Sequence, residues 1–408
     1  MIRMTKTWLI TIMLFIIIIV LSFLKLIPHN LFNEDIHINC QDNTMTITGD
    51  GLLTKQDIDN YFINSIYQKN TIVNVVVENG IDEIGYRCFE NFENLQKITL
   101  DNSIFSIDAY AFYRCFSLQE IILPENLTQI DDGVFMECSA LEKIHLGKNV
   151  NFIAENVFEN CLSLEEINFD EQNSYYASKD GVLYNSSLEK LILYPYAKQT
   201  STYTVPSSCK VINNNAFYNN QYIREIVIDG SLEEIGNYAF GNCVSLEKIL
   251  FKNEVITIRD FSFWNCISLK DFSLPKGLKS IGMYAFNGCN SITEIIMPES
   301  LQYVGQHAFA QMQSLKAITI STGIAQLPPW IFAYNISLSL ITIPSNITSI
   351  SSASFLGCEN LIEVKLENEH GIINSTAFQD CDNLDYIYTA SGCNLISDIK
   401  NAAGDIVY

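Results

Sequence analysis

One stretch of sequence decides the fold: Leu118-Gln-Glu-Ile121-Ile-Leu123-Pro124, followed by Leu127-Thr-Gln-Ile130, then Phe135 and Cys138. The same pattern recurs along the 408-residue chain, and its phenylalanine returns at a constant step of 23 residues within each of two groups. A fixed period of about 20 to 29 residues is the signature of a stacked solenoid. The phenylalanines are Phe89, Phe112, Phe135 and Phe158, then Phe217, Phe240, Phe263, Phe286, Phe309, Phe332, Phe355 and Phe378.

Apolar columns accompany the phenylalanine in every copy. Relative to Phe112, they lie five residues before it at Ile107, then six, nine and eleven residues after it at Leu118, Ile121 and Leu123. The last two positions differ by two, so their side chains share one face of a short β-strand, which suits β-branched isoleucine. A single coil cannot cover its apolar side, so we expect neighbouring coils to stack about 4.8 Å apart.

These residues resemble the BspA-like leucine-rich repeat family. The run from Leu118 to Cys138 looks like that family's unit, as does Ile281-Gly-Met-Tyr-Ala-Phe286-Asn-Gly-Cys289. The resemblance covers roughly residues 70 to 390 and follows a 23-residue variant, without the asparagine ladder of the commoner leucine-rich pattern. It implies an α/β-type repeat solenoid, a leucine-rich repeat array of about 12 to 13 coils with a stacked parallel β-sheet, mostly strand and irregular structure, and one inserted β-hairpin.

The composition is that of an ordered, acidic protein. Hydrophobic residues make up 48% of the chain, far more than a disordered sequence carries. There are 24 basic and 46 acidic residues, which give a formal charge of -22. That balance argues against binding nucleic acid through phosphates. The acidity itself is explained by solubility and repulsion between copies.

The twelve cysteines suggest at first a secreted disulfide framework. Their spacing favours a reduced, buried column instead, because equivalent Cβ atoms on adjacent coils lie about 5 Å apart, farther than the roughly 3.5 to 4.5 Å of a disulfide. Other coils place Phe92, Asn220, Met312 or Asn335 in this slot, so we expect it to be filled for packing. We also expect no zinc site, because a line of thiols supplies no tetrahedron. The column comprises Cys115, Cys138, Cys161, Cys243, Cys266, Cys289, Cys358 and Cys381, and the pairing of Cys40, Cys88, Cys209 and Cys393 stays open.

Residues 1–36 are interpreted as a signal anchor and a short linker. Trp8 to Leu24 is a run of 17 residues without charge, which is near the lower end for a membrane-spanning helix and slightly long for a signal-peptide core. No small-x-small cleavage site follows it. Arg3 and Lys6 precede the run, so we expect a single-pass span over residues 8–27 with the repeats outside the cytoplasm. The alternative is a cleaved signal peptide and a secreted protein.

Caps are expected at both ends of the array. Residues 37–78 form the N-terminal cap, with a strand over Asn43 to Thr48 and a short helix over Ile58 to Tyr67. The solenoid occupies residues 79–390, and residues 391–408 form the C-terminal cap, with a helix expected over Asn394 to Ala403. Terminal coils need such covers because their outer apolar side has no neighbour.

An insertion separates the two groups of phenylalanines. Phe158 and Phe217 are 59 residues apart, which is one period and 36 further residues. Within residues 170–208, Gly181 to Tyr184 and Lys190 to Pro195 predict two strands of a protruding hairpin. Tyrosine is enriched in binding surfaces, so its tyrosines are candidate contacts; the alternative is that they cover the edge of an enlarged coil. They are Tyr175, Tyr176, Tyr184, Tyr194 and Tyr196.

The outward side of the predicted strands is the main candidate binding surface. Alternation turns the eighth and tenth residues after each phenylalanine outward, and these columns vary in chemistry while the inward columns stay apolar. Both a tailored surface and unconstrained solvent exposure produce that contrast. The candidate contacts are Ile122, His145, Val227, Leu250, Ile296, Leu340, Tyr386 and Tyr388.

Catalysis has little support in the sequence. None of the five histidines has metal-ligand spacing or a nearby nucleophile motif, and no glycine-rich phosphate loop is present. We therefore expect no enzyme, metal site or small-molecule cofactor. The resemblance implies a membrane-anchored, cell-surface protein that binds another protein or a surface glycan in the manner of an adhesin. The alternative is a structural scaffold without an external ligand.

Overall fold

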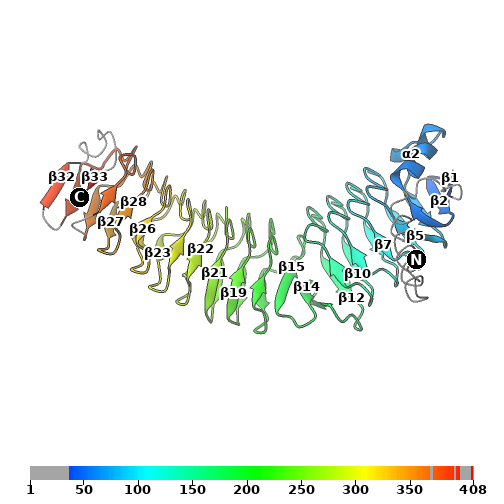
Figure 1. The fold of residues 1–408 in the computed structure, drawn as a ribbon, viewed down its shortest axis with the longest axis horizontal. Coiled ribbons are helices and arrows are strands. Elements are labelled where there is room, and N and C mark those ends of the chain that lie inside the picture. Colours follow the sequence, from blue (N-terminus) through cyan, green and yellow to red (C-terminus); the bar gives the residue numbers. More distant parts are fainter. Residues whose placement is uncertain (1–35, 368–370, 390–391, 396–405, 408) are drawn as a thin grey trace, which may run out of the picture.

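The protein is an arc of stacked coils, and both ends curve toward the same side (Figure 1). The computed structural model describes residues 36–367, 371–389, 392–395 and 406–407. About 14 turns of chain stack with almost no helix, which confirms the predicted leucine-rich repeat array. Among the described residues, no helix has the length and apolar character to cross a membrane. The predicted span over residues 8–27 lies outside the described residues.

The first set of strands, called ladder 1 here, contains the strand predicted in each repeat. Its strands pair in parallel at a register of 23 residues, as Ile98 with Ile121 and Ile121 with Ile144. The strands are β4 (Asn74–Val77), β6 (Lys97–Leu100), β8 (Glu120–Ile122), β10 (Lys143–Leu146) and β12 (Glu166–Phe169), then β16 (Thr202–Val205), β18 (Glu225–Ile228) and β20 (Lys248–Phe251), then β23 (Glu294–Ile296) and β25 (Ala317–Thr319), then β27 (Leu340–Ile343), β29 (Glu363–Leu366) and β31 (Tyr386–Thr389).

The second set, ladder 2, is built on the aliphatic column five residues before each phenylalanine. Most of its strands are only two residues long, so it adds few backbone bonds per coil. Its strands are β3 (Gly51–Leu53), β5 (Ile81–Ile84), β7 (Ser106–Ile107), β9 (Gln129–Ile130) and β11 (Phe152–Ile153), then β15 (Lys190–Leu193), β17 (Val211–Ile212), β19 (Leu232–Ile235), β21 (Val255–Ile258), β22 (Ser280–Ile281) and β24 (Tyr303–Val304), then β26 (Gln326–Leu327), β28 (Ser349–Ile350) and β30 (Ile372–Ile373).

The phenylalanine column is buried and forms the centre of the core. Successive rings stack nearly parallel: the centroids of Phe89 and Phe112 are 5.5 Å apart at 2°, and those of Phe112 and Phe135 are 5.5 Å apart at 4°. Removing one such ring costs about 3 to 5 kcal/mol.

The eight cysteines of the column are free thiols and buried, as predicted. Cys40, Cys88 and Cys209, whose pairing was left open, are also free and buried. The slot is not filled for packing alone, however, because its thiols donate hydrogen bonds to the preceding coil. Cys266 Sγ lies 3.0 Å from the carbonyl oxygen of Phe240, and Cys289 Sγ lies 3.1 Å from that of Phe263. Where asparagine replaces cysteine, Asn335 Nδ2 donates to the carbonyl oxygen of Phe309 at 2.9 Å.

The N-terminal cap covers the first coil with a hairpin and a helix. The strand β1 (His37–Gln41) pairs antiparallel with β2 (Thr44–Thr48), which lies beside β4 and confirms the predicted strand. Helix α2 (Lys55–Ile63) begins three residues earlier than predicted because Thr54 and Asp57 form a capping box, each side chain bonding the other's backbone N–H. A short 3₁₀ turn, η2 (Lys69–Thr71), leads into β4.

The C-terminal end is also covered by antiparallel strands. The strand β32 (Gly392–Leu395) pairs with β31, and β33 (Ile406–Val407) pairs with β30. The first two residues of the predicted helix over Asn394 to Ala403 therefore belong to a strand, and residues 396–403 lie outside the described residues.

The insertion contains the predicted strands, but the prediction that they protrude is wrong. The strands β13 (Tyr176–Lys179), β14 (Val182–Asn185) and β15 run antiparallel in sequence, and β15 then pairs in parallel with β17, so the hairpin is part of ladder 2. Gly181 O also accepts a hydrogen bond from Ile167 N at 3.0 Å, which places the hairpin turn against the edge of β12.

The insertion also contains a coil that the sequence reading missed. Tyr194 takes the phenylalanine position: its ring stacks on Phe217 at 4.7 Å, and its N–H donates to Ala216 O as Phe217 N–H donates to Ala239 O. The strand β16 then pairs with β18 at a register of 23 residues. The 59 residues between Phe158 and Phe217 are therefore two periods and 13 further residues.

The strand β14 divides the core into two parts. Val182 and Tyr184 pack into the C-terminal hydrophobic cluster, whereas Leu183 packs into the N-terminal one. Alternate residues of a strand face opposite sides, so this strand covers both halves of the array at once.

Candidate binding face on ladder 1

Ladder 1 is interrupted between β20 and β23, and the residue at the interruption is Phe272. Its position is the inward slot that holds isoleucine or valine in the other phenylalanine-centred coils. The larger ring packs against Phe263, Phe286 and Phe251 with centroid distances of 6.0, 5.0 and 6.2 Å. An oversized core side chain displaces its own backbone, and of the strand pairing only a bridge between Lys248 and Asp271 is left.

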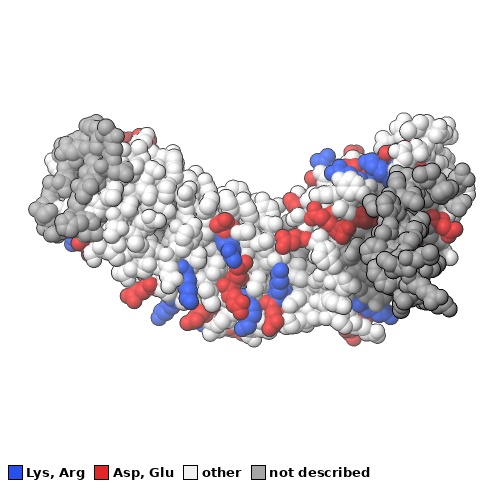
Figure 2. Space-filling model, in the orientation of Figure 1, with Lys and Arg blue, Asp and Glu red and all other residues white. Residues whose placement is uncertain are grey.

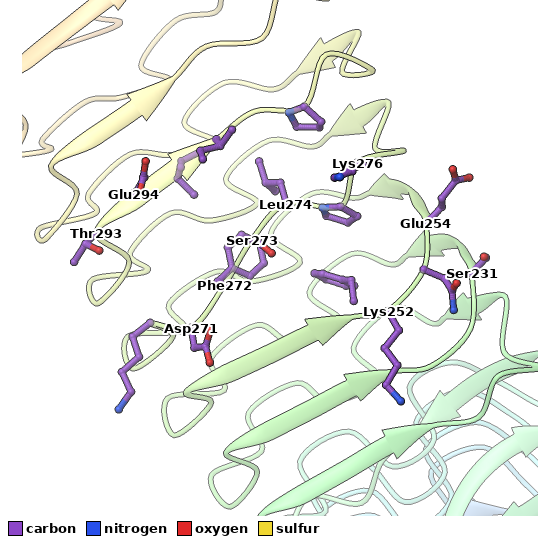
Figure 3. A pocket seen from close by; sticks show the side chains of 17 residues that line it. Ser231, Lys252, Glu254, Asp271, Phe272, Ser273, Leu274, Lys276, Thr293 and Glu294 are labelled. Carbon is purple, nitrogen blue, oxygen red and sulfur yellow. The ribbon is translucent and has the colours of Figure 1, made fainter.

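A hollow of about 1070 Å³ occupies this interruption. Figure 3 shows the segment with Asp271, Phe272 and Ser273 passing between two strands without forming one. The rings of Phe251 and Phe272 and the side chain of Ile296 line the hollow, with Pro275 and Pro298. Its charged lining residues are Lys252, Glu254, Lys270, Asp271, Lys276 and Glu294.

Rows of alternating charge run along ladder 1 beside the hollow. Lys248 Nζ lies 3.6 Å from carboxylate oxygens of both Glu225 and Asp271. One residue earlier in each coil, Glu247 accepts from Arg224 at 2.7 Å and from Lys270 at 2.7 Å. These two hydrogen bonds hold the pKa of the Glu247 carboxyl below its usual value. Figure 2 shows basic and acidic side chains next to one another over the middle of the array.

Most of the candidate contacts predicted on ladder 1 are exposed. Ile122, Leu250, Ile296 and Leu340 are 68%, 41%, 59% and 57% exposed, and His145, Tyr386 and Tyr388 are also exposed. Val227 is half-buried. This arrangement fits the outward orientation that the alternation predicts.

The structure does not bring these residues into one site. Leu250 lies on β20, and Ile296 on β23 lines the hollow. Ile122 lines a separate hollow of about 960 Å³ on the N-terminal half, and Tyr386 and Tyr388 lie on the last repeat strand. The apolar residues nearest the interruption, Leu250 and Ile296, are therefore the strongest candidates for contacts with a partner.

Three hairpin tyrosines lie away from the ladder 1 face. Tyr184 and Tyr194 are buried in the core, so their prediction as candidate contacts is wrong, whereas Tyr196 is also largely buried but lines a separate hollow of about 500 Å³. Tyr184 hydroxyl bonds the hydroxyl of Tyr203 at 2.5 Å inside the core. Tyr176 is half-buried, and its hydroxyl accepts a hydrogen bond from Ile153 N at 2.9 Å. Tyr175 is exposed. These rings fill the enlarged coil, which was the alternative interpretation.

Sequence reasoning missed the interruption itself, although a signal was present. Phe272 is the one aromatic residue in the strand column nine residues after the twelve phenylalanines.

No group of three or more His, Cys, Asp or Glu side chains within the described residues has the arrangement to hold a metal ion. The chemistry that this face offers is apolar contact within a rim of both charges.

Comparison with known proteins identifies the repeat. The family described as "BspA type Leucine rich repeat region (6 copies)" matches residues 60–190, 193–295 and 279–400. The chain belongs to the BspA-type leucine-rich repeat family. The resemblance drawn from the 23-residue unit is thereby confirmed. No curated protein matches this BspA-type chain.

Solved structures of bacterial leucine-rich repeat proteins are similar to this BspA-type chain. The pneumococcal vaccine antigen PcpA is similar at 20% sequence identity, with 83% of this chain and 93% of that chain covered and a TM-score of 0.57. A leucine-rich repeat protein from Eubacterium ventriosum is 19% identical, over 87% of this chain and 91% of that one, at a TM-score of 0.49. A third, from Bacteroides ovatus, is 18% identical over 88% and 100%, at a TM-score of 0.47.

Proposed function

We propose that this protein is a cell-surface binding module that holds another protein or a surface glycan on ladder 1, in the manner of an adhesin. The observation that carries the proposal is the hollow between β20 and β23, because it is the place where the regular sheet gives way to a recess with exposed apolar side chains beside it. Repeat solenoids present extended binding surfaces of this kind.

The lining of the hollow favours a protein as the partner. An apolar centre, with Ile296 and Phe272, is surrounded by lysine and acidic side chains. Protein interfaces combine an apolar centre with a polar rim in the same way. The paired charges on Lys248, Glu225 and Asp271 supply directional contacts at that rim.

Two substitutions test the proposed face. Ile296→Asp places a carboxylate in the lining of the hollow, and Leu250→Asp places one on the exposed side of β20 next to it. We expect each to weaken binding at least about tenfold, since truncating a hot-spot residue costs about 2 kcal/mol or more. A partner is first selected on an array of proteins and surface glycans with the full-length chain, and its affinity is then measured by surface plasmon resonance.

Ile122→Asp is the matched control, because it makes the same change on an exposed ladder 1 residue of the other half. It is expected to leave affinity unchanged. Equal affinity in wild type, Leu250→Asp and Ile296→Asp would move the site away from the hollow.

The location is part of the same proposal and is supported by the sequence of residues 1–36. A single-pass anchor over residues 8–27 would hold the repeats outside the cytoplasm, with secretion after cleavage as the alternative. Protease added to intact cells is expected to degrade the repeats. Repeats that survive this treatment would instead support an internal scaffold role.

A further inference from the structure

A second hollow, called the turn groove here, lies away from ladder 1. Its volume is about 500 Å³, within the usual range of ligand sites. It follows the turns on either side of the phenylalanine column, from the coil of Phe158 to the coil of Phe286, and none of its lining residues belongs to a ladder 1 strand. Five coil steps at strand spacing give it a length of about 24 Å.

Three aromatic rings stack along one side of the groove. They stand two residues before the phenylalanine: Tyr238 and Phe261 are 4.6 Å apart at 5°, and Phe261 and Tyr284 are 4.8 Å apart at 5°. All three have left-handed backbone, with φ of 53°, 58° and 56°. The same position holds Gly133 and Asn215 in other coils, the residue types that adopt this backbone most readily. The left-handed backbone is a regular feature of the repeat, found also at Arg87 and Ala353, and the fold does not require rings there.

Two more rings form the opposite side. Tyr218 and Trp264 lie edge-on to Tyr238, with centroid distances of 6.0 and 6.5 Å. They occupy the column one residue after the phenylalanine, and the residue between them in that column is Gly241. A Cβ atom at Gly241 would lie 3.1 Å from Tyr218 Cδ2 and 3.3 Å from Tyr238 Cδ1. The absence of a side chain therefore keeps the space between the rings open.

The polar lining is rich in amides and contains no lysine or arginine. Asn287 lines the groove, is more than nine-tenths buried, and its Nδ2 has no hydrogen-bond partner. A buried donor left unpaired is costly unless a ligand group satisfies it. Asn156, Asn214 and Asn215 add further amides, which both donate and accept.

We propose that the turn groove binds a neutral oligosaccharide. Sugars present apolar C–H groups that pack against the exposed parts of aromatic side chains, and their hydroxyls both donate to and accept from amides. Glu155 and Glu159 at one end, without any basic lining residue, disfavour an acidic sugar. The length of the groove favours a chain over a single sugar. This site is independent of the partner proposed for ladder 1.

Binding is tested with the full-length chain on a printed array of neutral and acidic oligosaccharides, followed by isothermal titration with the best neutral hexasaccharide. Gly241→Met places a long side chain in the slot between the rings, and the same column holds a methionine at Met136. Asn287→Ala replaces the unpaired amide with the residue found at Ala310. Trp264→Ala removes one wall. Each variant is expected to bind at least about tenfold more weakly.

Two controls separate this site from ladder 1. Ile296→Asp and Met136→Ala lie outside the groove and are expected to bind the hexasaccharide as wild type does, while Gly241→Met keeps its affinity for the ladder 1 partner. Circular dichroism and thermal melts confirm that each variant is folded. The proposal is overturned if no neutral sugar binds, if only acidic sugars or a lysine-rich peptide bind, or if Gly241→Met and Asn287→Ala bind like wild type.

Discussion

At the scale of one residue, the cysteine of the column has two structural roles. It fills a small buried slot, and its thiol donates to the phenylalanine carbonyl of the coil before, as Cys243 Sγ does to Phe217 O at 3.0 Å. Asparagine meets the same requirement at Asn335 because its amide also donates. Where the slot holds cysteine or asparagine it gains a hydrogen bond as well as packing, whereas Phe92 and Met312 fill it by packing alone.

Burial of these thiols makes the stability of the fold sensitive to alkaline pH. It raises the pKa of Cys115, Cys161, Cys243 and Cys266 well above the ordinary value, so they stay protonated in the folded chain. In the unfolded chain they ionise near pH 8.5. Their contribution to stability is fully present below about pH 8.5 and is lost as the pH rises above it, by up to about 1.4 kcal/mol per pH unit for each thiol.

Urea unfolding at pH 7.5, 8.5 and 9.5 measures this effect, and the midpoint is expected to fall between the last two. A Cys243→Ala, Cys266→Ala double variant should show a shallower fall, at the cost of lower stability at pH 7.5. A midpoint that stays level up to pH 9.5 in the wild type would contradict the prediction.

At the scale of the strand, the repeat explains regular pairing, and a single residue explains the break between β20 and β23. Phe272 occupies a slot sized for isoleucine, and the strand there is lost. Phe272→Ile is expected to let the segment around residue 272 form a strand that pairs with β20 on one side and β23 on the other. It is expected to raise the free energy of unfolding by about 1 kcal/mol, a typical gain for a substitution toward the repeat consensus. The strand formed in this way should occupy the hollow and weaken the binding of the ladder 1 partner.

Thermal unfolding and surface plasmon resonance measure these two effects, and Ile249→Val is a control for a mild change in the same column of the adjacent coil. Higher stability without weaker binding would separate the hollow from the binding site. Lower stability would show that the surrounding core has adapted to the larger ring.

The periodic columns predicted the coil, the strands of ladder 1 and the buried cysteines, because a solenoid repeats the same local contacts; the short strands of ladder 2 were not predicted. Tyr194 was missed because the 13 extra residues shifted it out of phase with Phe158, although it lies 23 residues before Phe217. The turn groove was also missed. It depends on rings at Tyr238 and Phe261 and on the small Gly241, which meet only when three coils are stacked.

At the scale of the whole molecule, the described residues form two main hydrophobic cores. One cluster contains residues from Cys40 to Ile167 together with Leu183, the other extends from Val182 to Ile387, and β14 contributes to both. In a solenoid each coil contacts only its neighbours, so we expect the halves to unfold as separate cooperative units.

Hydrogen exchange in increasing urea tests this expectation with two matched variants. Phe112→Ala should lower the stability of the N-terminal unit by about 3 to 5 kcal/mol and leave the other unchanged, and Phe309→Ala should do the reverse. If either variant lowers protection equally in both halves, the array is one cooperative unit.

The backbone bonds between successive ladder strands also determine how the molecule responds to mechanical force. Pulled from its two ends, the array is loaded across the bonds that join one coil to the next, so the load acts on a few bonds at a time. Each coil that detaches frees 23 residues, or about 80 Å of extended chain. A protein tethered at one end and attached to a partner at the other would lengthen in steps under flow, and each step would dissipate energy before the attachment itself was strained.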